Sequence, residues 1–107
     1  MPKISTHALD LTSGRPAQGL VIRLIFAGSI VAETLTNSDG RCDGPLATNP
    51  EPGEYTLEFS VGDYFRSRGQ ETPFLEVVPI RFQVSPEESY HIPLSFTPWA
   101  YSTYRGS

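Results

Sequence analysis

The sequence contains a single cysteine, Cys42, and no apolar run long enough to cross a lipid bilayer. One cysteine cannot form an intrachain disulfide, which fits a reducing compartment. The most apolar segment, residues 20–32, is interrupted by Arg23 and Gly28 and is too short for a membrane span. Because Met1-Pro2-Lys3-Ile4 leads directly into a strand pattern, we expect no signal peptide. These absences together predict a soluble, cytoplasmic protein.

Charged residues are also scarce, at 19% of the chain, and the formal net charge is -4. This composition does not indicate a nucleic acid or an anionic membrane as a partner. The 107 residues suit one domain, residues 1–107, with a core that is sufficient without disulfides or metals. By contrast, ten prolines and nine glycines are many for this length, and they favour short strands joined by frequent turns.

Alternation of apolar and polar residues is the main structural signal. In residues 54–59, Tyr55, Leu57 and Phe59 fall on one face of an extended strand and the polar residues fall on the other. Turn-forming residues separate this segment from others with the same pattern. We therefore expect an all-β, two-sheet sandwich of the immunoglobulin-like type. The other expected strands are residues 5–10, 20–26, 31–36, 77–84, 90–96 and 100–104.

One segment, residues 63–68, has the pattern of a helix. Asp63 suits the N-cap position and Gly69 suits the position that ends a helix. The helix can have only a turn or two at this length.

Two prolines and the last strand carry the marks of sheet edges. Pro79 and Pro93 have no N–H to donate to a neighbouring strand, so we expect each strand to leave that position unpaired, at an edge or a bulge. The strand expected over residues 100–104 is short and rich in Tyr and Thr, which makes it a candidate for pairing or packing against another subunit.

The chain has two histidines, His7 and His91, and each falls in the middle of an expected strand. His7 shares a strand face with Ser5 and Leu9. Taken singly, each histidine is most simply a half-exposed strand residue. A metal site is weakly supported, because no third ligand stands at a useful spacing and no cysteine or carboxylate cluster accompanies them. Imidazole titrates near working pH, so general acid–base chemistry is the sharper hypothesis.

Arg41 directly follows the turn formed by residues 37–40. An arginine there is most often a solvated surface charge, although a fixed guanidinium can also bind a planar imide or urea-like ring and stabilise an oxyanion. Spacing alone leaves both interpretations open. The sequence contains no G-x-S-x-G motif of the kind that presents a serine nucleophile. Nothing near Cys42 marks it as an activated thiol. Direct attack of water on an activated carbonyl is therefore the favoured chemistry.

Specific motifs occur at both ends of the chain. His91 lies within Tyr-His-Ile-Pro-Leu, and the last seven residues read Tyr-Ser-Thr-Tyr-Arg-Gly-Ser. With these motifs the chain resembles the 5-hydroxyisourate hydrolases, the enzymatic branch of the transthyretin-like proteins. Transthyretin hormone carriers share the fold of that family but lack this tail. The other segments that carry the resemblance are residues 5–10, 14–17, 36–41 and 61–65.

The resemblance implies a transthyretin-like sandwich and a homotetramer, a dimer of dimers, with its sites in a channel at the dimer–dimer interface. The implied substrate is 5-hydroxyisourate, which is opened to 2-oxo-4-hydroxy-4-carboxy-5-ureidoimidazoline on the route from urate to allantoin. No metal or organic cofactor is expected. The residues that the resemblance places in the site are His7, Arg41 and His91 as catalytic groups and Tyr104, Arg105, Gly106 and Ser107 as substrate-binding groups.

Two non-enzymatic alternatives remain open at this point. A small-ligand carrier of the transthyretin type would use the same channel for binding alone, and it would need an apolar channel rather than two histidines and an arginine. An immunoglobulin-like interaction module would be a monomer or would have a flat exposed patch, and it would usually carry a secretion signal.

Overall fold

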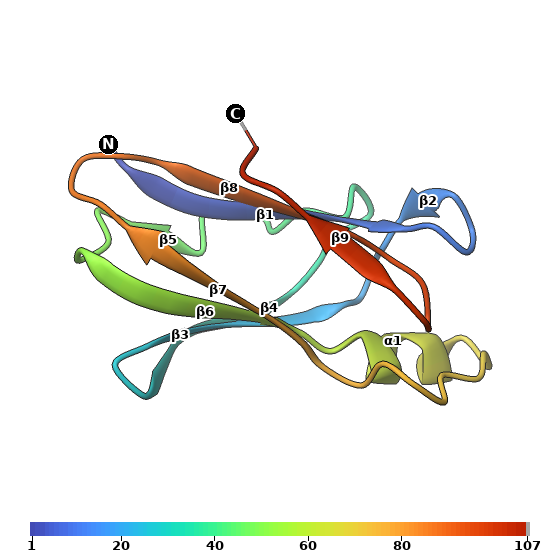
Figure 1. Ribbon diagram of the computed structural model, residues 1–107. Coiled ribbons are helices and arrows are strands. Elements are labelled where there is room, and N and C mark those ends of the chain that lie inside the picture. Colours follow the sequence, from blue (N-terminus) through green and yellow to red (C-terminus); the bar gives the residue numbers. More distant parts are fainter. Residues whose placement is uncertain (107) are drawn as a thin grey trace.

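The computed structural model describes residues 1–106 and shows two β-sheets packed face to face, which confirms the expected sandwich (Figure 1). Its strands are β1 (Lys3–Asp10), β2 (Arg15–Pro16), β3 (Val21–Phe26), β4 (Ser29–Leu35), β5 (Ala47–Thr48), β6 (Gly53–Phe59), β7 (Val78–Val84), β8 (Tyr90–Phe96) and β9 (Tyr101–Thr103), and its helix is α1 (Val61–Ser67). The first sheet has the order β2-β1-β8-β9, with β5 also paired to β1. The second sheet has the order β4-β3-β6-β7.

The core lies between the two sheets and follows the alternation seen in the sequence. In β6, Tyr55, Leu57 and Phe59 are buried and the residues between them are not. Burial of this apolar surface is the main force that holds the sheets together.

No helix in the described residues is long and apolar enough to cross a membrane.

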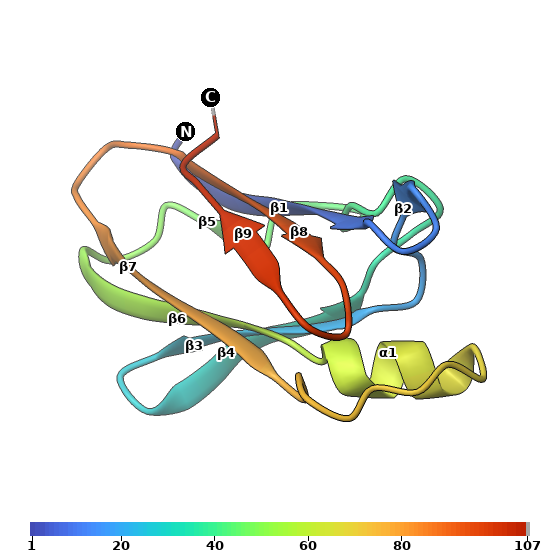
Figure 2. The ribbon, with the colours of Figure 1, turned by 45° about the vertical axis from the view of Figure 1, so that its right-hand side comes forward.

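The pairing of β1 with β8 matters most for the site, because it is parallel and joins opposite ends of the chain. Both strands lie inside the first sheet, and β9 runs along the other side of β8 (Figure 2). In this register Ser5 lies beside His91 and His7 lies beside Pro93. Residues distant in the sequence therefore come together on one rigid sheet face.

The two prolines occupy different kinds of position. Pro79 lies in β7, the edge strand of the second sheet, as expected. Pro93 is left unpaired toward β9, as expected, but it lies in the interior strand β8, so the prediction of an edge is wrong for it. The pairing of β8 with β9 ends at Leu94 and Thr103. It resumes in the same register at a bridge between His91 and Gly106. Since Pro93 offers no N–H, the interruption falls opposite it.

Helix α1 begins two residues before the expected start. Its N-cap is Ser60, whose side chain makes no capping hydrogen bond, so the prediction that Asp63 is the N-cap is wrong. The N–H of Gly62 at the helix start instead donates to the carbonyl of Glu76, at 2.9 Å. The predicted stop is confirmed, because Gly69 follows the helix with a φ of 70°, which favours glycine.

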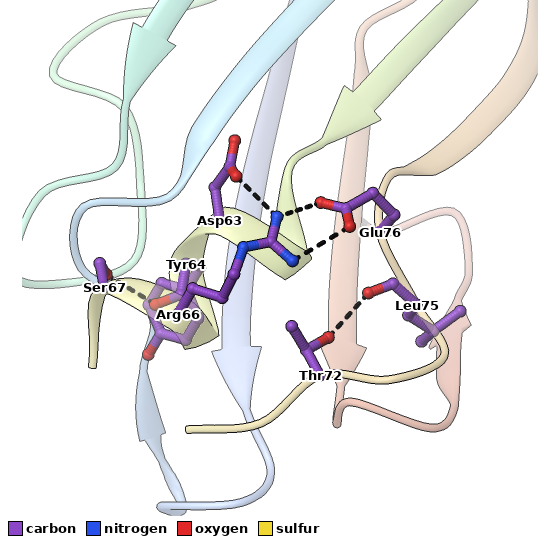
Figure 3. Close-up of polar contacts among 7 residues, drawn as sticks. All are labelled: Asp63, Tyr64, Arg66, Ser67, Thr72, Leu75 and Glu76. Carbon is purple, nitrogen blue, oxygen red and sulfur yellow. Dashed lines mark hydrogen bonds and ion pairs between the residues drawn. The ribbon is translucent and has the colours of Figure 1, made fainter. Parts of the chain in front are cut away.

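Asp63, Arg66 and Glu76 form a cluster of charges that ties the segment after the helix back to it (Figure 3). Arg66 donates through Nη2 to Oδ1 of Asp63 at 2.8 Å, and through both terminal nitrogens to Glu76. This ion pairing lowers the pKa of Glu76 and raises that of Arg66. A further hydrogen bond, from Thr72 Oγ1 to the Leu75 carbonyl at 2.8 Å, shapes the returning segment.

Asp10 is a buried carboxylate at the end of β1. It accepts hydrogen bonds from the Tyr64 hydroxyl at 2.9 Å and from the N–H of Thr12 at 2.8 Å. Burial and the neighbouring Asp10 raise the pKa of Tyr64 to about 12. The group is therefore structural, because it fixes the helix to the first sheet.

Candidate active site

His91 is held on the outward face of β8 by its neighbours on both sides. Its Nδ1 lies 2.9 Å from the Ser5 hydroxyl on β1. On the other side, the N–H of Gly106 donates to the His91 carbonyl at 2.8 Å. A Cβ at position 106 would lie 2.7 Å from Cδ2 of the imidazole, so only glycine lets the tail backbone approach the ring this closely.

Arg41 is placed beside β1 by the turn that precedes it. The Asn37 side chain accepts hydrogen bonds from the N–H groups of Asp39 and Arg41, at 2.9 and 3.2 Å. Gly40 has a φ of 73°, and a Cβ there would lie 2.4 Å from the Ala8 carbonyl. The turn thus lies against β1, and Arg41 forms a backbone bridge with His7. The predicted residues His7, Arg41 and His91 are brought together on one sheet face.

The electrostatics of this face favour neutral imidazole and a bound negative charge. Burial, Arg41 and His7, in that order, lower the pKa of His91, so its ring is neutral at neutral pH. No carboxylate in residues 1–106 lies within ion-pair distance of Arg41. An arginine with no protein counter-ion can stabilise negative charge that develops on a substrate.

A hollow of about 430 Å³, here called the His91 hollow, opens on this face. It is lined by Lys3 and Ser5 of β1, by Arg41, by residues 89–91 and by Gly106. His7 lies next to Ser5 on the same face, beside the hollow rather than among the residues that line it. The hollow is large enough to admit a small planar ring and is bordered by two cationic side chains.

The tail residues divide between two places. Gly106 is at the His91 hollow, whereas Tyr104 and Arg105 line a second hollow of about 460 Å³ between β7 and β9. The Arg105 guanidinium lies 4.3 Å from the centre of the Tyr90 ring and bonds to Glu88 at 3.2 Å. Within one chain, Tyr104 and Arg105 are therefore not brought to His91. Ser107, the fourth predicted tail residue, lies outside the described residues.

Two residues at the hollow, Lys3 and Ser5, were not predicted as site residues. The signal that could have found them is strand alternation, because both share the outward face of β1 with His7. Cys42 is half-buried next to Arg41, and burial together with Asp43 raises the pKa of its thiol, which disfavours a nucleophilic role. Residues 1–106 contain no group of three or more side chains placed to hold a metal ion.

Comparison with known proteins places this geometry in context. The model of the HIUase/Transthyretin family matches residues 4–106. A relative named 5-hydroxyisourate hydrolase 2, from Rhizobium meliloti, is 48% identical and covers 98% of this chain and 96% of its own length. The solved structure of Klebsiella pneumoniae 5-hydroxyisourate hydrolase superposes with a TM-score of 0.91 at 35% identity, over 100% of both chains.

The carrier branch has the same fold at a lower identity. Sea bream transthyretin, solved in complex with thyroxine, superposes with a TM-score of 0.87 at 26% identity over 97% of this chain and 94% of its own. The fold is therefore common to both branches, while the fuller sequence likeness is to the hydrolases.

Proposed function

The chain belongs to the HIUase/transthyretin family and is a 5-hydroxyisourate hydrolase, and we propose that it opens the substrate ring with a histidine-activated water. The product of this reaction is 2-oxo-4-hydroxy-4-carboxy-5-ureidoimidazoline, and the reaction is one step in the degradation of urate to allantoin. The observation that carries the proposal is the meeting of His7, His91 and Arg41 on one sheet face.

The proposed reaction begins when one histidine of the pair takes a proton from water. The hydroxide adds to a ring carbonyl, and Arg41 stabilises the negative charge on the carbonyl oxygen. The tetrahedral intermediate then collapses, the adjacent carbon–nitrogen bond breaks, and the protonated histidine returns its proton to the leaving nitrogen. General-base help is typically worth ~10²–10⁴-fold, and an oxyanion donor ~10²–10³-fold. No cofactor enters this scheme.

The decisive experiment uses 5-hydroxyisourate made in place from urate and urate oxidase. Its absorbance decay is followed with and without the protein, and then with Arg41→Ala. We expect faster decay with the wild-type protein and near-spontaneous decay with the variant. If the wild-type protein gives no acceleration, the hydrolase assignment fails and a carrier on the same scaffold becomes the better explanation.

The assembly that we propose is a homotetramer, a dimer of dimers. Strand β9 is one edge of the first sheet and β7 is one edge of the second, so pairing with a second copy through these strands would extend both sheets. Because Tyr104 and Arg105 line the hollow between these edges, their proposed role at a substrate site requires a neighbouring copy. Light scattering coupled to gel filtration tests the tetramer, and a monomer would contradict it. The cytoplasmic location is also a proposal, tested by cell fractionation.

A further inference from the structure

We propose that Ser5 is a positioning residue for His91: its hydroxyl donates to Nδ1 and places the imidazole proton on Nε2. The inference deepens the proposed function and rests on it. It assigns different tasks to two histidines that the sequence leaves equivalent.

The first support is geometry. Ser5 and His91 are direct neighbours in the parallel pairing of β1 with β8, and both side chains are half-buried on the outward face. The Ser5 Oγ to His91 Nδ1 distance is 2.9 Å. The two residues belong to regular strands in the interior of the sheet, so the contact is set by the backbone register.

The second support is the number of hydrogens available. A neutral imidazole has one N–H, and a serine hydroxyl has one O–H. In the described part of the chain, the Ser5 side chain makes no hydrogen bond except the one to His91. If Nδ1 donated, the hydroxyl hydrogen would have no acceptor among residues 1–106. If Ser5 donates, the hydrogen is used and the ring proton moves to Nε2.

The ring's surroundings then determine which edge meets the substrate. Ser5 occupies Nδ1 and the Gly106 backbone packs against Cδ2, so the Cε1–Nε2 edge is the part left for a ligand. The charged and titratable groups around the ring in residues 1–106 are Arg41, His7 and Lys3. Burial, followed by Arg41 and His7, lowers the pKa of His91. A neutral ring with Nε2–H cannot accept a proton at that atom.

It follows that His91 acts as a hydrogen-bond donor to the carbonyl oxygen of the substrate, together with Arg41. The proton of the attacking water then goes to His7. The two histidines are therefore a donor and a base, and the Ser5 hydroxyl sets this division.

The test compares Ser5→Thr with Ser5→Val, because these side chains have the same shape and only threonine keeps the hydroxyl. We expect Ser5→Val to have a kcat/KM about 10–100-fold below that of Ser5→Thr, the loss seen when the outer-shell partner of a metal-ligating histidine is removed. The loss should fall mainly on kcat, since the donor acts on charge that develops in the transition state. Ser95→Val is the matched control, because Ser95 lies on the same face of β8 away from the hollow.

Imidazole ¹⁵N NMR gives a second readout that a merely structural role would not move. We expect His91 in the wild-type protein and in Ser5→Thr to be protonated at Nε2, and Ser5→Val to show a mixture of tautomers. The proposal is overturned if the wild-type ring is protonated at Nδ1, or if Ser5→Val matches Ser5→Thr in both rate and tautomer.

The two assays separate this proposal from the function on which it rests. If the wild-type protein fails to accelerate decay of 5-hydroxyisourate, the function is wrong, and the wild-type tautomer still decides whether Ser5 donates to His91. If catalysis is present and the tautomer is Nδ1–H, only the role of Ser5 is wrong.

Discussion

Two arginines in this chain, Arg66 and Arg41, have opposite surroundings. Arg66 is enclosed by the carboxylates of Asp63 and Glu76, and its charge is neutralised within the protein (Figure 3). Arg41 follows a tightly bonded turn, lies beside two histidines and has no carboxylate partner in residues 1–106. The Arg66 side chain is held by its carboxylate partners, whereas Arg41 is held through its backbone, and its guanidinium has no carboxylate partner in residues 1–106.

The difference separates a stabilising cation from the one that we propose to be catalytic. Exposed ion pairs such as those of Arg66 each contribute little to the free energy of unfolding. Here they hold the segment after α1 against the helix. Burial is the main cause of the lowered pKa of His91, and Arg41 lowers it further because it disfavours a second positive charge nearby. The surroundings of Arg41 therefore favour the binding of an anion. Four predictions test the contrast between Arg41 and Arg66.

The largest effect is expected from the histidines beside Arg41. His7→Asn and His91→Asn should each lower kcat/KM by ~10²–10⁴-fold, because each removes a group that moves a proton or donates to the oxyanion. Both strands should still form, since these side chains lie outside the core. Stopped-flow decay of fresh substrate measures the rate, and circular dichroism checks the fold. Full activity in either variant would refute the role of that histidine.

The contrast itself is tested by a matched pair, Arg41→Gln and Arg66→Gln. The first should lower kcat/KM by ~10²–10³-fold without lowering the melting temperature, because it removes an oxyanion donor that has no carboxylate partner in the described chain. The second should leave kcat/KM unchanged and lower the melting temperature slightly, because it breaks the cluster with Asp63 and Glu76. An equal loss of activity in both would show that the two arginines do not differ as described.

A smaller effect is expected from Gly106→Ala. The added methyl group would lie 2.7 Å from the imidazole of His91 and must displace the ring or the tail. Since a misplacement of about 1 Å can cost up to about 100-fold, we expect a fall in kcat/KM of up to that size. Gly44→Ala is the control, because a Cβ at Gly44 meets no atom within 4 Å. Wild-type rates in Gly106→Ala would show that the close approach has no catalytic consequence.

The smallest effect concerns pH. His91 has a pKa below its ordinary value of 6.5, so the unfolded chain takes up a proton before the folded chain does, and stability falls as pH decreases below about 6.5. The part of the activity that needs a neutral His91 should persist through pH 6.5 and decline only below it. Arg41→Gln removes one cause of the lowered pKa of His91. The pH below which its remaining activity declines, the acid limb of the pH profile, should therefore be higher than in the wild-type protein. Arg66→Gln should leave the acid limb unchanged. An unmoved limb in Arg41→Gln would argue against coupling between Arg41 and His91.

The sequence was sufficient for the parts of the fold that depend on local patterns. Alternating residues predicted the longer strands, most clearly β6, which buries a single face. Gly69 predicted the end of the helix. The two-residue strands β2 and β5 are too short to show any alternation. The start of α1 depends on the carbonyl of Glu76, which lies far along the chain, and the placement of Pro93 depends on β9.

The same limit applied to the site. Motifs along the chain, among them residues 5–10, 36–41 and 90–94, were sufficient to propose His7, Arg41 and His91, because they carry the resemblance to the hydrolases. The contact between Ser5 and His91 depends on which strands are neighbours and in what register, and no local pattern encodes that. Strand alternation alone could have marked Ser5, by its shared face with His7.

The parallel pairing of β1 with β8 also bears on the order of events during folding. The hydrogen bond between Ser5 and His91 spans 86 positions of the chain. Such a contact requires closure of a long loop, and parallel pairing of this kind forms slowly. A chain that is still being synthesised has β1 long before it has β8. Catalytic competence should therefore be among the last properties to return on refolding, after the local hairpins of the second sheet have formed.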